Sequence, residues 1–287
     1  MTRLEARGSH QLHVTFYGVR GSTPSPAEAN RRYGGNTATV VVQNGQEDPI
    51  VLDLGTGLRM WGSNMPAGSP VRATALVTHI HWDHIQGLPF FGPIHHPASS
   101  LLVYAPEQEE GPLGQVFDGF MRPPYFPVHY SQLQGDVRFV GVRASEFEVN
   151  SATVRVRPVP HVGPTVGYRI TWGGTSVAYV SDHQAPLGLD SVADSVLDLC
   201  DGVDLLIHDA QYTPEEFEGK STWGHCTMEY ALLVAKMSGA RRLCLFHHDP
   251  GHTDEDLDAL HAEIKALPRG GRLREIVGAS EGLVLNV

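Results

Sequence analysis

The chain has 287 residues, of which 41% are hydrophobic, and this composition indicates a folded globular protein and excludes an intrinsically disordered one. The net charge of −11 argues against broad electrostatic capture of nucleic acid or of an anionic membrane. No apolar run approaches the roughly 20 residues that cross a bilayer, and residues 1–11 form a polar extension without an apolar signal core. Three cysteines do not make a disulfide framework, so we expect a cytoplasmic protein.

The first part of the chain predicts β-strands. Runs of apolar and β-branched residues indicate strands over 13–18, 37–43, 49–54 and 74–78. Further strands are expected around Val103 and over 137–140, 153–159, 168–171 and 176–180. The last two flank Gly173-Gly174, which is typical of a hairpin turn.

Helices are predicted in the second part. They are expected over 189–200, where apolar residues recur with the helical period, over 227–237, closed by Gly239, and over 254–267, capped by Thr253. Short buried strands over 204–207 and 243–246 lie between them. Two sets of strands with helices after each set, and no linker, indicate one domain from residue 12 to 287 with two sheets and helices outside.

The segment 92–135 fits this pattern poorly because it interleaves aromatic residues with prolines. One interpretation is an ordinary packed insertion. The other is a lid or wall over a site, where aromatic side chains such as Tyr125 and Phe126 stack on a flat ring of the substrate.

The sharpest feature of the sequence follows the predicted strand 74–78. Three histidines and an aspartate lie within six residues, in the run HIHWDH at 79–84. In an extended backbone His79 and His81 face the same way, and a helix that begins after them turns Asp83 and His84 toward a neighbouring point. Imidazole and carboxylate suit zinc, and also manganese or iron, so the run predicts ligands for two neighbouring ions.

Two ions need more ligands than one loop supplies. His161, Asp182 and His247 each follow a predicted strand, where loops meet at a sheet edge and sites are commonly built. A carboxylate at Asp182 can bridge two cations about 3.5–4 Å apart. His248 is an alternative to its neighbour His247.

The HIHWDH run resembles the HxHxDH signature of the metallo-β-lactamase superfamily. The order of His161, Asp182 and His247 is similar to that of its later motifs, and Asp53 matches its early aspartate, which braces the metal loop without binding metal. The resemblance extends from Val14 to His247. It implies an α/β fold, the αββα four-layer sandwich, with a dinuclear site along one edge of the two sheets.

The same resemblance implies the ligand sets and the cofactors. The cofactors are two divalent metal ions, with Zn²⁺ favoured over Mn²⁺ and Fe²⁺. Asp182 lies between the ions, and the two sets are His79, His81 and His161 for one ion and Asp83, His84 and His247 for the other.

Three further stretches are similar to the phosphodiesterase branch of that superfamily, which includes RNase Z-like endonucleases and cyclic-phosphate hydrolases. The opening run FYGVRGSTP contains Arg20, a candidate substrate contact. The run LIHDAQ contains His208 and Asp209 and is similar to a histidine–acid–alanine motif, with Asp in place of Glu. The run GHCT contains His225 and resembles a GHST stretch that leads into a helix.

These stretches suggest catalytic roles. Because His225 precedes a predicted helix, it can donate to phosphodiester oxygens or to the leaving oxygen beside the cations. His208 with Asp209 is a candidate pair that orients His225. Asp83 or Asp182 orients the water that two cations activate for attack on phosphorus.

The distribution of charge favours a small substrate. Long RNA is bound through Lys and Arg contacts to phosphates, and the sequence has no basic cluster beyond Arg31-Arg32 and Arg241-Arg242. We therefore expect a small phosphodiester, such as a cyclic nucleotide or cyclic phosphate, and neither a large nucleic acid nor a membrane as partner. The low content of charged residues, 18%, together with exposed aromatics favours a homodimer.

Other functions use the same ligands. A lactonase or thioesterase would have an identical metal site, and an RNA 3′-end endonuclease of the RNase Z type belongs to the same branch. A β-lactamase is disfavoured because its site commonly carries a cysteine where this chain has Asp182, and a flavin-coupled di-iron oxidoreductase because it tends to have an acid at the position of His81. A scaffold with a retired site is disfavoured because all seven ligands are present.

Overall fold

The computed structural model describes residues 11–287. The first-half strands are β1 (Leu12–Gly18), β2 (Thr39–Asn44), β3 (Ile50–Leu52), β4 (Arg72–Leu76), β5 (Ser100–Pro106), β6 (Asp136–Val142) and β7 (Ser145–Val149). The remaining strands are β8 (Ala152–Pro158), β9 (Val166–Trp172), β10 (Thr175–Val180), β11 (Leu205–Asp209), β12 (Arg242–Phe246), β13 (Glu275–Gly278) and β14 (Val284–Asn286). The α-helices are α1 (Gly57–Ser63), α2 (Trp82–Ile85), α3 (Leu113–Phe120), α4 (Asp194–Cys200), α5 (Pro214–Lys220), α6 (Met228–Ser238) and α7 (Asp254–Ala266). Short 3₁₀ turns are η1 (Glu28–Asn30), η2 (Leu88–Phe90), η3 (Gly92–His95) and η4 (Tyr130–Gln132).

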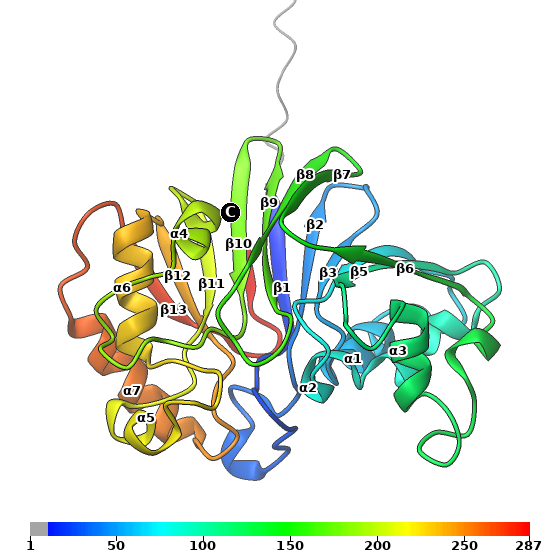
Figure 1. Cartoon of the computed structure of the whole chain (residues 1–287), viewed down its shortest axis with the longest axis horizontal. Coiled ribbons are helices and arrows are strands. Elements are labelled where there is room, and N and C mark those ends of the chain that lie inside the picture. Colours follow the sequence, from blue (N-terminus) through cyan, green and yellow to red (C-terminus); the bar gives the residue numbers. More distant parts are fainter. Residues whose placement is uncertain (1–10) are drawn as a thin grey trace, which may run out of the picture.

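Two seven-stranded sheets face each other (Figure 1). The strand order is β14-β1-β2-β3-β4-β5-β6 in the first sheet and β13-β12-β11-β10-β9-β8-β7 in the second. The strands β3 to β6 are parallel, as are β10 to β13, so several strands of each sheet end at the same edge. Loops that follow these ends can therefore meet, which is the arrangement that the predicted metal site requires.

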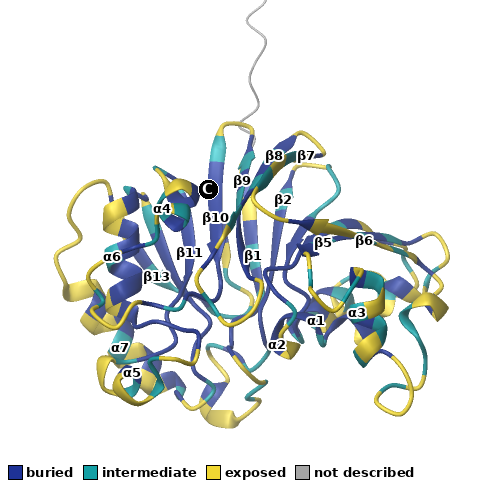
Figure 2. Cartoon of the chain, viewed as in Figure 1, coloured by how far each residue is buried: buried dark blue, intermediate teal, exposed yellow. Residues whose placement is uncertain are grey.

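Apolar side chains form three hydrophobic clusters: one between the two sheets, and one between each sheet and the helices on its outer face. The core between the sheets includes Phe16 of β1 and Trp172 of β9, both fully buried. Helices α1 and α3 cover the outer face of the first sheet, and α4, α6 and α7 cover the outer face of the second. Figure 2 shows buried strands inside and exposed residues on the outer sides of the helices. The predicted αββα four-layer sandwich is confirmed.

Local signals also locate the turns and caps. The β9–β10 hairpin turns at Gly173 and Gly174, whose φ angles are 62° and 89°, values that favour glycine. Thr253 caps α7, because its hydroxyl accepts from the backbone N–H of Asp256. The helix predicted from residue 189 begins only at Asp194, since Leu189 has a φ of 51° and cannot continue a right-handed helix.

The boundaries of the aromatic segment 92–135 are corrected by the structure. Strand β5 lies inside this segment and pairs with both β4 and β6, so it belongs to the first sheet. The parts before and after β5 lie outside the sheet: η3 with the following loop, and residues 107–135. There, Phe117 of α3 packs on Phe139 of β6 with their ring centroids 4.4 Å apart, which is the arrangement of a packed insertion.

Two further predictions concern the chain as a whole. Within residues 11–287 no helix combines the length and the apolar character that a membrane span requires. The predicted polar extension, residues 1–11, lies outside the described residues except for Gln11.

We expect His261 to make the stability of the fold depend on pH. Its burial lowers its pKa to about 4 from an ordinary value of 6.5, and its Nδ1 lies 3.1 Å from the Tyr33 hydroxyl. The unfolded chain therefore binds this proton more readily, and stability is lost as the pH falls from about 6.5 toward 4. The loss at pH 5 should be about 2 kcal/mol.

Urea unfolding at pH 7 and pH 5 measures this effect, with His261→Gln as the comparison. The variant should lose less stability between the two pH values than the parent, and the metal centre affects both proteins equally. Identical losses would contradict the assignment to His261.

Candidate metal centre

The fold brings four distant stretches to one edge of the sandwich. Strand β4 of the first sheet leads into HIHWDH at 79–84, and strands β8, β10 and β12 of the second sheet lead to His161, Asp182 and His247. Helix α2, which begins within the HIHWDH run, lies just below the strands in Figure 1, near the middle of the molecule. The strand ends thus supply ligands from both sheets.

All seven predicted ligands lie together, and His225 joins them. Within each of four groups the ligand atoms are no more than 4.8 Å from one another. Asp182 is the carboxylate that belongs to two of the groups, and one of its oxygens lies 3.8 Å from His79 Nε2 and 3.5 Å from His247 Nε2. The groups are His79, His81 and His161; His79, His84 and Asp182; Asp83, His84 and His247; and Asp182, His225 and His247.

Hydrogen bonds at Nδ1 turn the Nε2 atoms of several histidines toward the centre. His84 Nδ1 lies 2.8 Å from Asp53 Oδ2, and His161 Nδ1 lies 2.7 Å from the carbonyl oxygen of Gly224. Both partners can only accept, so each Nδ1 carries the proton and each Nε2 has a free lone pair. His247 Nδ1 makes the same kind of bond to Gln211 Oε1 at 2.9 Å.

The donor set fits metal ions. The Nε2 atoms of His84 and His247 are 3.3 Å apart, and both rings hold their proton on the opposite nitrogen. A positive charge is therefore needed between these nitrogens and the adjoining carboxylates, and either a second proton on His84 or a bound cation supplies it. The carboxylates of Asp83 and Asp182 adjoin these nitrogens at 3.1 Å from His84 Nε2. Imidazoles and carboxylates in this arrangement are a ligand set for divalent cations such as zinc, manganese or iron.

The charged groups of the centre shift the pKa values of the neighbouring carboxyl and imidazole groups. Burial favours the neutral form of Asp182, but His247, His84 and His79 outweigh it and hold the pKa of this carboxyl well below its usual range. Burial also opposes protonation of His84, but Asp83, Asp182 and Asp53 outweigh it and raise the pKa of this imidazole. The carboxylates are therefore ionised and available as ligands.

Asp53 braces the centre from below. Its Oδ1 accepts from the backbone N–H of Thr78 at 2.7 Å, and its Oδ2 accepts from Tyr179 Oη and His84 Nδ1, both at 2.8 Å. Asp53 is fully buried and contributes to none of the ligand groups. It joins β3 to the HIHWDH loop of the first sheet and to β10 of the second.

Ser22 and Gln211 also support the centre, and sequence reasoning assigned them no role. The backbone N–H of Ser22 donates to Asp83 Oδ2 at 2.8 Å, and Gln211 Nε2 donates to the Ser22 hydroxyl at 3.2 Å. Ser22, Asp53 and His247 have φ angles of 60°, 59° and 59°, which are uncommon for residues other than glycine. Backbone strain is thus concentrated at this site. No local sequence pattern signals it.

His247 and His248 face opposite ways. His247 Nε2 lies 3.2 Å from Asp83 Oδ2, inside the centre, whereas His248 Nε2 lies 2.9 Å from the carbonyl oxygen of Ala279. Of the two alternatives that the sequence leaves open, the structure brings His247 into the ligand group.

His225 lies beside the ligands and is held by Asp209. Its Nδ1 is 3.1 Å from Asp209 Oδ2 and 3.6 Å from Asp182 Oδ2. Burial opposes its protonation, but the charges of Asp209 and Asp182 outweigh it and raise the pKa of His225. The bond to Asp209 leaves Nε2 of His225 free to act on a substrate.

The structure corrects the expected contribution of His208. Its Nε2 lies 3.0 Å from His183 Nδ1, and its Nδ1 bonds the carbonyl oxygen of Asp209, so none of its hydrogen bonds reaches His225. Adjacent residues of a strand point to opposite faces, and on β11 it is Asp209 that points to the centre. Of the predicted pair, Asp209 alone orients His225.

The structure also corrects the expected contribution of Arg20. This side chain is fully buried, and its guanidinium donates to the carbonyl oxygens of Gly34, Asp249 and His252 at 2.7–3.0 Å. It holds loops together and cannot contact a substrate. Tyr125 is 75% exposed, and Phe126 packs edge-on against Phe90 with ring centroids 5.8 Å apart. These two aromatics are not among the residues that contact the ligand groups.

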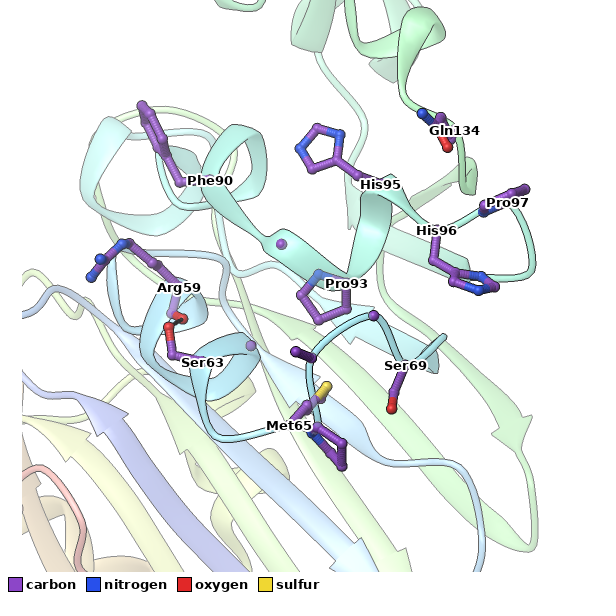
Figure 3. Close-up of a pocket in the computed structure, with 15 residues that line it drawn as sticks. Arg59, Ser63, Met65, Ser69, Phe90, Pro93, His95, His96, Pro97 and Gln134 are labelled. Atoms are coloured by element: carbon purple, nitrogen blue, oxygen red, sulfur yellow. Dashed lines mark hydrogen bonds between the residues drawn. The ribbon is translucent and has the colours of Figure 1, made fainter.

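A pocket of about 570 Å³ lies apart from the centre (Figure 3). It is formed by the end of α1, the following loop and the segment of η2 and η3, and its lining includes Arg59, Phe90, His95 and His96. In Figure 3 the two imidazoles point in different directions. None of the metal-ligand candidates lines it.

A family model described as the beta-lactamase superfamily domain matches residues 50–248, which is more than half of the chain and includes all seven ligands. The chain belongs to the beta-lactamase superfamily. The resemblance predicted from the HIHWDH run is confirmed.

Relatives within the superfamily match almost the whole chain. A Ribonuclease Z of Natronomonas pharaonis is 24% identical, over 91% of this chain and 96% of that protein. The metallo-beta-lactamase fold protein YhfI from Bacillus subtilis has a TM-score of 0.71 at 20% identity and covers 97% of this chain and 100% of its own. A diphosphatase from the PhnP family has a TM-score of 0.69 at 22% identity, over 96% and 97% of the two chains. The family model and the Ribonuclease Z relative confirm the predicted class, a metal-dependent hydrolase. The two solved structures confirm the fold.

We predict that Asp53→Asn weakens metal binding. The amide replaces one carboxylate oxygen by an N–H donor, and Oδ2 of Asp53 accepts from both His84 and Tyr179. Either orientation of the amide loses at least one support of the metal loop, so affinity should fall about 10- to 100-fold. Competition with a chromogenic zinc chelator measures it.

Asp136→Asn is the matched control. Its carboxylate is half exposed and pairs with Arg138 at the surface of β6. It should bind metal like the parent protein. Equal affinities for all three proteins would show that Asp53 does not support the metal loop.

Proposed function

We propose that the chain is a phosphodiesterase that holds two divalent cations and hydrolyses a small phosphodiester. Zinc is the cation that we favour. One observation carries this proposal: His225 lies 3.6 Å from the shared ligand Asp182 and is oriented by Asp209, so a proton donor adjoins a dinuclear ligand set. A phosphodiester depends on such a donor more strongly than a carboxylic ester or a lactone does, because its non-bridging oxygens gain charge in the transition state.

The residues that would hold the cations are the seven ligands described above, with Asp182 between the two sets. When bound, such a pair of cations lowers the pKa of a water molecule and neutralises phosphoryl oxygens. The chain's own carboxylates, Asp83 and Asp182, are ionised and can orient that water for attack in line with the leaving oxygen.

His225 completes the reaction by protonating the leaving oxygen. Its raised pKa keeps the imidazole protonated at a higher pH than usual, and Asp209 fixes the proton on Nδ1 and the ring in place. The Nε2–H can then donate to the alcohol as the phosphorus–oxygen bond breaks.

A ribonuclease of the RNase Z type is the second candidate, favoured by relatives of that name that match nearly the full chain. The net charge of −11 and the burial of Arg20 favour the small substrate over RNA. A single hydrolase domain from residue 12 to 287, a cytoplasmic location and a homodimer belong to the same proposal. Three free and buried cysteines support the reducing compartment.

We predict that His225→Ala lowers kcat about 10²- to 10⁴-fold while metal content stays unchanged. The protein loses its proton donor but keeps all seven ligands. Turnover of bis-p-nitrophenyl phosphate and elemental analysis of the same sample measure both quantities. His95→Ala, an imidazole in the pocket of Figure 3, is the matched control and should keep full activity. An unchanged kcat in metal-replete His225→Ala removes His225 from the mechanism.

Removal and return of metal distinguish the reaction classes. We expect chelation to abolish hydrolysis of bis-p-nitrophenyl phosphate, and Zn²⁺ or Mn²⁺ to restore it, because the ligand groups supply no other nucleophile. A lactone and a thioester should react at least about 100-fold more slowly than the diester. Faster hydrolysis of the lactone would instead support a lactonase, and cleavage of a tRNA precursor alone would support the ribonuclease.

A further inference from the structure

We propose that the mouth of the metal centre is an apolar rim that binds a flat aromatic group of the substrate, with Trp82 and Trp223 as its main contacts. The inference rests on the proposed phosphodiesterase function and narrows its substrate class. The substrate is then a phosphodiester in which the ester group that stays on phosphorus carries an aromatic ring.

The metal centre opens to solvent on one side. His81 is exposed, whereas the imidazole of His161 is only 1% exposed, and the distance between His81 Nδ1 and His161 Nε2 is 3.3 Å. The entrance therefore lies at His81, and the imidazole of His161 lies next to it on the inner side. The other five candidate ligands are buried: His79, Asp83, His84, Asp182 and His247.

Two exposed tryptophans flank this entrance along the chain. Trp82 directly follows His81 and is 75% exposed. Trp223, which is 63% exposed, precedes Gly224, and the carbonyl oxygen of Gly224 accepts from His161 Nδ1 at 2.7 Å. A Cβ atom on Gly224 would lie 2.3 Å from His161 Cε1, so this segment and the ligand are in close contact.

Two exposed aliphatic side chains extend the rim. Val162 directly follows His161, and Leu187 lies two residues after Ala185, whose N–H donates to the carbonyl oxygen of His225. These four large apolar side chains are exposed on segments that carry a ligand or contact one, and such exposure costs free energy in water and marks a surface that a partner covers. Here the partner must also reach the centre, so we assign the rim to the substrate itself.

The rim has no positive charge. Residues 79–87, 159–165, 181–188 and 221–227, which bear the entrance, contain neither Lys nor Arg. The nearby Lys220 is paired with Asp249 and lies 4.7 Å from the centroid of the Tyr212 ring. Further phosphates of a polynucleotide would find no cation here, whereas an aromatic ring can stack on an indole.

Two p-nitrophenyl diesters of equal charge and identical leaving group test the rim: phenyl p-nitrophenyl phosphate and methyl p-nitrophenyl phosphate. We expect Trp82→Ala and Trp223→Ala each to lower kcat/KM for the phenyl ester about 10-fold and to leave the methyl ester within about 2-fold. Met237→Ala, which removes an exposed apolar side chain from α6, should change neither. Equal losses for both esters, or no loss for the phenyl ester, would overturn the rim.

Tryptophan fluorescence gives a second measurement that does not depend on turnover. Trp61 and Trp172 are buried, so a change in emission on binding reports mainly on Trp82 and Trp223. Metal-loaded protein should show a saturable change with diphenyl phosphate and none with dimethyl phosphate, and the double variant should show neither. No difference between the two phosphates would overturn the proposal.

The outcomes separate the rim from the function. A protein that binds diphenyl phosphate in this way but hydrolyses no diester contradicts the phosphodiesterase and keeps the rim. A protein that hydrolyses both esters, with the Trp82→Ala and Trp223→Ala variants unaltered, keeps the phosphodiesterase and contradicts the rim. Conversion of a dimer to a monomer by Trp82→Ala, measured by light scattering, would make the rim an interface between copies and would also contradict the proposal.

Discussion

The candidate metal centre depends on one buried carboxylate, Asp53, which belongs to none of the ligand groups. Asp53 accepts hydrogen bonds from the loop after β4, from His84 and from Tyr179 of the opposite sheet. A buried carboxylate without hydrogen-bond donors costs free energy. Asp53 and its donors therefore hold one another in place. Its position at φ 59° directs the carboxylate under the HIHWDH loop. The two sheets are thereby fixed relative to each other at the point where their ligands must meet.

Asp209 has a similar relation to the proposed chemistry. It is fully buried, and it accepts from His225 Nδ1 and from the backbone N–H of His183. The second bond fixes the chain directly after Asp182. A single carboxylate therefore orients both the proton donor and the segment that carries the shared ligand, and changes at Asp209 act on both.

Much of the fold and the ligand set could be predicted from the sequence because the signals are local. HIHWDH sits in one loop, and His161, Asp182 and His247 each follow a strand whose pattern is plain. The burial of Arg20 could not be predicted, because the carbonyl oxygens that its guanidinium contacts belong to Asp249 and His252, more than 220 residues away. No local pattern carries that information. The error at His208 was avoidable, since strand alternation allows only one of two adjacent residues to face the centre.

His225 is placed for two different chemical roles. It serves as proton donor in the proposed reaction, yet with Asp182 and His247 it also forms a group of the right size and chemistry to ligate a cation. An imidazole that is coordinated cannot become the doubly protonated imidazolium, and the single N–H that it keeps is a far weaker acid. Excess metal would then inhibit the enzyme. A cation beyond the two proposed ones would bind His225 and lower turnover without displacing any of the seven ligands.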